Sequence, residues 1–205
     1  MNRSRLIARP TPPGLQRGMT MIESLVAIVV LSFGMLGVVG LQAAALQSNK
    51  EARYQSSAVR LARELGELLR GNKDVAIGTT SSANPYLVEY TGTLPTTTAD
   101  CFTAACTTTL QVAQFQIREW LTRVADELPG ARVSVCIDDA SFDSGGLPVW
   151  DCSGSGGTVV VKIGWTQATT DHAAYGSSSY GTSTPGLARA TRPGVVVALI
   201  AGSSE

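Results

Sequence analysis

The sequence predicts an α+β fold in which one long N-terminal helix packs on a small antiparallel β-sheet with an extra helix. Three observations lead to this fold class. No charged residue occurs in residues 24–49, which is enough apolar chain to form a transmembrane first half of the long helix. The next residues repeat apolar side chains at helical spacing, and later segments alternate apolar and polar residues as strands do.

The long helix is expected from Met19 to about Arg70, with Gly71-Asn72 as its stop. Its second half has one apolar face, formed by Tyr54, Ala58, Leu61, Leu65 and Leu68. On the solvent face, two ion pairs of helical spacing are expected, Arg60 with Glu64 and Arg63 with Glu67.

Three glycines interrupt the apolar half of this helix and allow two interpretations. Small residues at Gly34, Gly37 and Gly40 permit close packing against another helix. Each glycine also lowers helix stability by up to about 1 kcal/mol, so the segment could instead loosen. The sequence leaves both interpretations open.

The rest of the chain supplies the extra helix and the sheet. Thr107 or Thr108 can cap a helix whose apolar stripe runs to Leu128, where Pro129-Gly130 stops it. Strands with one buried face are expected at residues 133–137 and 159–165, a continuous apolar strand at 195–201, and a short one at 86–90. Two polar loops, residues 138–158 and 166–193, separate these strands.

The chain contains four cysteines, which can form three different pairings. Cys101 and Cys106 lie in one loop, and Cys136 and Cys152 flank another. Local pairing closes short loops, so we expect the disulfides Cys101–Cys106 and Cys136–Cys152. A zinc site is the alternative, but the spacing contains no C-x-x-C pair.

Composition and motifs argue against an enzyme and against a nucleic-acid-binding protein. Beyond four leader arginines, 12 basic side chains face 16 acidic ones, without a basic block. The single histidine, His172, lies in a polar loop, and no nucleotide-binding glycine motif occurs, so no cofactor is expected. Clustered carboxylates at Asp138, Asp139 and Asp143, with Asp151 nearby, form a weak calcium candidate. A solvated turn is the alternative interpretation.

The N-terminal segment carries the most specific motif. A basic leader ends at Arg17-Gly18, Met19 follows, and Glu23 stands five residues after the glycine at the start of the apolar run. A carboxylate at the edge of an apolar segment is costly if it sits at depth, which favours a functional role. An ordinary secretory signal, cleaved near Ala43–Ala45, is the alternative, but the helical pattern continues through these alanines.

This arrangement resembles the signal of type IV pilins. The resemblance implies that prepilin peptidase cleaves between Gly18 and Met19 and that Met19 becomes N-methylated. It also implies that Glu23 neutralises the terminal amine of a neighbouring subunit during assembly. In this family, phenylalanine is commoner than methionine at the position of Met19.

A finer resemblance, over about residues 15–165, is to minor pilins known as type IV pilus modification proteins. It rests on the apolar run ending at Leu41-Gln42, on Glu119-Trp120-Leu121, on Leu128-Pro129-Gly130, and on the strands at 133–136 and 159–165. It implies a subunit that helps to initiate type IV pilus assembly within a tip or priming complex. A minor pseudopilin of a type II secretion system is the alternative.

These resemblances give an expected organisation. Residues 1–18 form the leader, 19–46 the transmembrane and assembly helix, and 47–205 a periplasmic pilin-like domain that includes the second half of the long helix. The chain is expected in the inner membrane as a single-pass protein and at the pilus tip after assembly. Its expected partners are other minor pilins, the major pilin, prepilin peptidase and the inner-membrane assembly machinery, with a tip adhesin as a further candidate.

Overall fold

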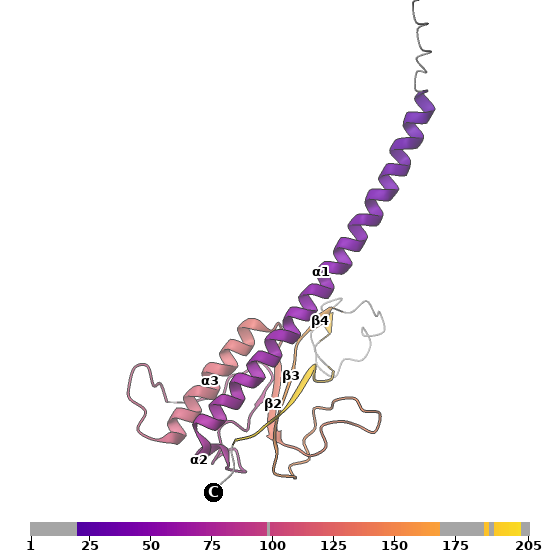
Figure 1. The fold of residues 1–205 in the computed structure, drawn as a ribbon. Coiled ribbons are helices and arrows are strands. Elements are labelled where there is room, and N and C mark those ends of the chain that lie inside the picture. The colour runs from indigo at the N-terminus through magenta and orange to yellow at the C-terminus, as the bar shows by residue number, and fades with distance from the viewer. Residues whose placement is uncertain (1–19, 98, 169–186, 189–190, 202–205) are drawn as a thin grey trace, which may run out of the picture. The chain divides into compact units, whose positions relative to one another are not determined.

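The structure is a computed structural model that describes residues 20–97, 99–168, 187–188 and 191–201 (Figure 1). The leader (residues 1–18, including Gly18), Met19 and His172 lie outside the described residues. The helices are α1 (Met21–Gly71), α2 (Lys73–Ala76) and α3 (Thr109–Glu127). The strands are β1 (Glu89–Tyr90), β2 (Arg132–Ile137), β3 (Val159–Gly164), β4 (Gln167–Ala168), β5 (Leu187–Ala188) and β6 (Val195–Leu199).

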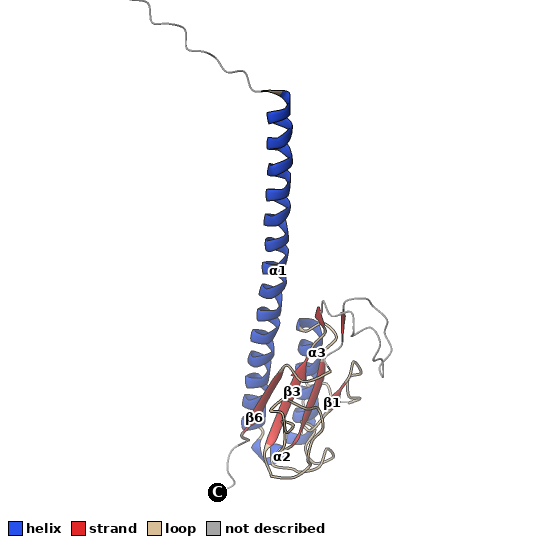
Figure 2. Cartoon of the chain, turned by 90° about the vertical axis from the view of Figure 1, so that its right-hand side faces the viewer, coloured by secondary structure: helices blue, strands red, loops and turns tan. Residues whose placement is uncertain are grey.

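The chain forms two compact units, one up to Leu46 and one from Gln47 onward, and α1 contributes to both. The second unit contains a four-stranded sheet of order β1-β2-β3-β6 in which every neighbouring pair is antiparallel (Figure 2). A separate two-stranded ribbon joins β4 and β5. A long helix, a small antiparallel sheet and an extra helix are therefore all present, as the sequence predicts.

The second half of α1 supplies one wall of the core. Its buried residues are Ala58, Leu61, Ala62, Leu65, Gly66 and Leu69, while Tyr54 and Leu68 are partly buried. The predicted face is therefore the buried one, except that at its end Leu69, and not Leu68, is fully buried. Helical spacing did not distinguish these two neighbouring leucines, and packing against the sheet and α3 determines which one is buried.

Helix α3 lies beside this half of α1 and begins with a complete capping box. Thr108 accepts a hydrogen bond from the Gln111 N–H at 3.2 Å, and the Gln111 side chain accepts one from the Thr108 N–H at 3.3 Å. Trp120, fully buried, donates from Nε1 to the Leu61 carbonyl of α1 at 2.9 Å. Leu110, the first apolar residue of the predicted stripe, is 36% exposed at the first turn.

Strand β3 departs from the prediction of one buried face, because all six of its residues are buried. It lies between β2 and β6, with Val159, Val161 and Ile163 in the core on the helix side. On the opposite side, Val160 and Lys162 are also buried. The loop of residues 138–158, expected to be solvated, packs on this side of the sheet. Asp138 binds Lys162 of β3, while Trp150 and Cys152 contact Arg132 and Cys136 of β2.

Candidate functional site

The apolar first part of α1 is the surface in the described chain that most needs a partner. Met21 is 92% exposed, Phe33 70% and Leu41 74%, and the other large apolar side chains between Met21 and Leu41 are 44–73% exposed. Contiguous apolar surface of this size marks a membrane or protein contact. The helix is long and apolar enough to cross a bilayer.

Thr20, directly before the first residue of α1, caps the start of this helix. Thr20 accepts a hydrogen bond from the Glu23 N–H at 3.4 Å, and its carbonyl accepts one from the Ser24 N–H at 3.2 Å. The pattern Thr20-x-x-Glu23 is the sequence signature of a capping box and could have revealed this start. Glu23 is exposed in the first turn, where a carboxylate also favours the helix dipole.

The three glycines of this segment lie within continuous helix. A Cβ atom added at Gly34, Gly37 or Gly40 would meet no other atom within 4 Å. Steric crowding within the chain therefore does not require glycine at these positions. In the described structure the helix does not loosen there, and the close-packing interpretation needs another molecule.

Near the start of the second unit, one carboxylate joins α1 to the end of β3. Glu51 accepts hydrogen bonds from Trp165 Nε1 at 3.1 Å and from Gln167 Nε2 at 3.1 Å. Trp165 is buried and packs so closely on Gly194 that a Cβ atom there would lie 2.8 Å from its ring. Residue 165 ends a strand predicted to have one buried face, but nothing in the sequence indicated the hydrogen bond between Trp165 and Glu51.

Ion pairs link α1 to α3 rather than running only along α1. The predicted Arg60–Glu64 pair is present at 3.9 Å, but Arg60 also binds Glu127 and Glu64 binds Arg123 across the two helices. The predicted pairing of Arg63 with Glu67 is wrong, because Glu67 pairs with Arg70 instead. Tertiary packing brings closer partners to Arg60 and Glu64 than helical spacing does, whereas Glu67 pairs with a residue three positions further along α1.

The carboxylates proposed for calcium have partners within the chain. Asp138 is buried and binds Lys162 Nζ at 2.6 Å and the Ser141 hydroxyl at 2.6 Å. Asp143 accepts a hydrogen bond from Arg192 at 2.8 Å, and Asp139 accepts one from the Ser155 hydroxyl. Within the described ranges, no group of three or more metal-binding side chains is brought together. The calcium hypothesis stays a weak prediction.

Burial by itself would raise the pKa of Asp138, because it disfavours the charged form. Hydrogen bonds from Lys162, from Ser141 and from the N–H groups of Ser153 and Ala140 outweigh burial and hold this pKa well below its usual range. Lys162 also donates to the Asp151 carbonyl at 2.6 Å. The pair is therefore ionised and structural.

Both predicted disulfides are present. Cys101–Cys106 has a Cα–Cα distance of 5.2 Å, and Cys136–Cys152 one of 6.4 Å. The second disulfide ties the 138–158 loop to β2, beside the cation–π contact in which Arg132 lies 4.2 Å from the Trp150 ring centre. Trp150 is buried, although it lies in a polar loop.

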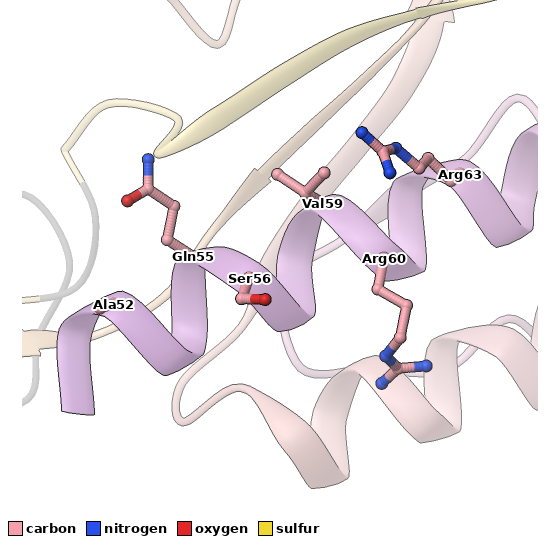
Figure 3. A pocket seen from close by; sticks show the side chains of 6 residues that line it. All are labelled: Ala52, Gln55, Ser56, Val59, Arg60 and Arg63. Atoms are coloured by element: carbon pink, nitrogen blue, oxygen red, sulfur yellow. The ribbon is translucent and has the colours of Figure 1, made fainter. Parts of the chain in front are cut away.

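A groove follows the outer face of α1 within the second unit (Figure 3). Its lining comes entirely from this helix and consists of Ala52, Gln55, Ser56, Val59, Arg60 and Arg63. Figure 3 shows β6 passing beside Gln55 and Val59, with Arg60 pointing to the opposite side, toward α3.

Comparison with known families assigns the N-terminal half of the chain. Residues 14–39 match the model described as the prokaryotic N-terminal methylation motif. Residues 40–118 match the model described as type IV pilin Tt1218. No curated protein and no solved structure matches the chain.

An exposed apolar helix ahead of a unit that contains a sheet is typical of a membrane-anchored protein. Together the two matches run without a gap from residue 14 to residue 118. The chain belongs to the type IV pilin superfamily and carries the methylation motif of prepilin peptidase substrates.

Proposed function

We propose that this chain is a minor pilin of the type IV pilus modification protein type, known as PilV, which helps to initiate pilus assembly within a tip or priming complex. The exposed apolar half of α1 after the methylation motif is the observation that carries the proposal. Such a helix needs the bilayer before assembly and other apolar helices afterwards.

In this proposal, prepilin peptidase cleaves between Gly18 and Met19, and Met19 is then methylated. Glu23 lies in the first turn of the mature helix, where it can meet the amine of a neighbouring subunit. The unit from Gln47 onward lies in the periplasm, where its disulfides can form. The partners are the other minor pilins, the major pilin and the inner-membrane assembly machinery, and after assembly the chain lies at the pilus tip.

A strain lacking this chain tests the proposal. It should carry few surface pili, full-length chain supplied in trans should restore them, and sheared pili should contain the chain at low abundance. Mass spectrometry of the restored chain should find methylated Met19 at its N-terminus. Normal piliation without the chain, or an N-terminus at Leu46, would contradict the proposal.

The second candidate is a minor pseudopilin of a type II secretion system, since such proteins share the leader and the long helix. The chain length of 205 residues favours the pilus, because the pseudopilins that resemble it are usually shorter. The same deletion strain distinguishes the two functions. Loss of exoprotein secretion with normal pilus number would assign the chain to secretion.

A further inference from the structure

Strand β6 forms one edge of the four-stranded sheet, and its outer side has no strand partner in the described chain. An edge strand exposes unpaired N–H and C=O groups that can pair with another extended chain. The question is which groups of β6 point outward and what lies beside them.

The hydrogen-bond pattern identifies these groups. The Asp138 N–H donates to the Thr158 carbonyl at 3.0 Å, so Thr158 points toward β2. Alternation along an antiparallel strand then directs Val159, Val161 and Ile163 toward β6. The Ile163 carbonyl indeed accepts a bond from the Gly194 N–H, directly before β6.

On β6, the partners of these three residues are Leu199, Val197 and Val195. The backbone groups of the two residues between them, Val196 and Ala198, therefore point away from β3. Ala198 is exposed, and Val196 is partly exposed. Among the described residues, no backbone group pairs with this side of β6.

The groove on α1 lies next to this edge (Figure 3). Gly66, three residues after the groove residue Arg63, approaches Leu199 of β6, whose Cδ2 would lie 3.5 Å from an added Cβ. An extra strand paired with β6 would thus lie over Ala52, Ser56 and Val59, whose short side chains leave room for it.

The charge of the groove specifies the partner further. Arg60 is neutralised by Glu64 and Glu127. Arg63 is exposed and has no ion pair within the part of the chain that the structure describes. A carboxylate on an incoming strand, placed near Arg63, would form an ion pair with this side chain.

We propose that the outer edge of β6 and the adjoining α1 groove bind an extended, acidic segment of a different pilin subunit, which adds a fifth strand to the sheet. The inference rests on the proposed function, because it assumes a partner from the same assembly system. Backbone pairing would provide affinity, and the groove with Arg63 would provide specificity.

The test places the photocrosslinker p-benzoylphenylalanine at Ser56 of the full-length chain, in cells that express every pilin subunit of the same system. We expect crosslinks to a non-helical acidic segment of one other subunit, mapped by mass spectrometry. Ala198→Pro removes an outward N–H without touching the pairing with β3, so it should reduce this crosslink about tenfold. Ala198→Ser retains the N–H and should crosslink like the wild type.

Charge is tested with two exposed basic residues on α1. Arg63→Glu should reduce the crosslink, and Lys50→Glu, on the side of the helix away from the groove, should not. Unchanged crosslinking in Ala198→Pro, or crosslinks only to a neighbour's N-terminal helix or to a second copy of this chain, would overturn the inference. Periplasmic level and disulfide content verify that each variant folds.

The two proposals fail in different ways. If the unlabelled wild-type chain restores pili while Ala198→Pro and Arg63→Glu behave as the wild type, the β6 edge is not used and the proposed function stands. If the wild-type chain neither restores pili nor enters sheared pili, the proposed function itself is wrong.

Discussion

The Lys162–Asp138 pair is the residue-scale feature with the largest expected effect on stability. Both side chains are fully buried between β3 and the 138–158 loop. Removing one member of a buried ion pair leaves an uncompensated charge, which typically costs about 3–5 kcal/mol. Lys162→Met should therefore lower the free energy of unfolding by about that amount, measured by urea titration of the full chain in detergent.

A matched control comes from the exposed pair of Arg70 with Glu67, in which both side chains are more than half exposed. Such surface pairs contribute about 0–1 kcal/mol, so Arg70→Met should change stability little. Equal losses in the two variants would show that burial does not determine the contribution of the Lys162 pair.

The same pair gives a pH dependence whose sign follows from the lowered pKa of Asp138. In the unfolded chain an aspartate titrates near about 3.9, and in the folded chain its pKa lies lower. The stabilisation is therefore complete above the unfolded pKa and is lost as pH falls through the acidic range below it.

Asp138→Asn should flatten this dependence. The difference in unfolding free energy between pH 5.5 and pH 3 should be smaller in the variant than in the wild type. Asp100 and Asp143, whose pKa values are also lowered, remain in both proteins and cancel in the comparison. Identical pH slopes would assign the acid sensitivity to carboxylates other than Asp138.

The sequence could identify the residues of local motifs but not the long-range pairs. Thr108 as a helix cap and both disulfide pairings follow from spacing within one segment. Nothing in the sequence indicated that Lys162 would meet Asp138, because one lies on a strand and the other in a loop that the fold brings back. Glu51, which binds Trp165 over 114 residues of separation, was missed for the same reason.

At the scale of elements, the 138–158 loop contributes more buried residues than its composition suggests. Its glycine, serine and aspartate residues predict a solvated turn, yet Trp150 and Asp138 are buried against the sheet. Regular strands and helices were predictable from their periodicity. The fold of this loop was not, because irregular segments have no repeat that reports which side is buried.

The disulfide that anchors this loop should contribute more stability than the other one. Cys136 and Cys152 are 16 residues apart, whereas Cys101 and Cys106 are 5 apart. A closed loop of about 15 residues contributes about 3 kcal/mol in the chain-entropy model, and a shorter loop contributes less. Replacing Cys136 and Cys152 together by alanine should therefore lower the urea midpoint more than replacing Cys101 and Cys106.

Double replacement avoids free thiols that would form incorrect bonds. Protease resistance of residues 138–158 in the full chain provides a second measurement, since this loop should become cleavable only in the first double variant. A larger loss of stability on removing Cys101–Cys106 would mean that this smaller loop carries contacts beyond chain closure.

At the scale of the whole molecule, the two units differ in how much of their apolar surface is exposed. The unit from Gln47 onward buries its apolar side chains, whereas the described part of the first unit exposes them. This difference in exposure agrees with the sequence, because an uncharged run and an amphipathic stripe have distinct patterns. It could not identify the groove beside β6, which depends on where the last strand packs.

Glu23 lies near the start of the apolar helix of the first unit, and we expect assembly to depend on it. We propose that its carboxylate stays near the headgroups in the membrane and pairs with the amine of a neighbouring subunit during assembly. Pairing compensates the cost of burying both charges, and removing the carboxylate alone leaves the amine uncompensated at about 3–5 kcal/mol. Loss of pairing should therefore impair assembly without impairing insertion.

Two substitutions separate this role from the local cap with Thr20. Thr20 caps the backbone N–H of Glu23, and this bond does not depend on the Glu23 side chain. A glutamine or glutamate at the third position can also complete a capping box, so Glu23→Gln removes only the charge, while Glu23→Ala removes both the charge and the side chain that can complete the box. Both variants, supplied to the deletion strain, should be inserted and cleaved after Gly18, as intact mass will show, yet restore few pili in shearing assays. Full piliation with Glu23→Gln but not Glu23→Ala would reduce Glu23 to a helix cap, and loss of cleavage in either variant would place its role in recognition by the peptidase.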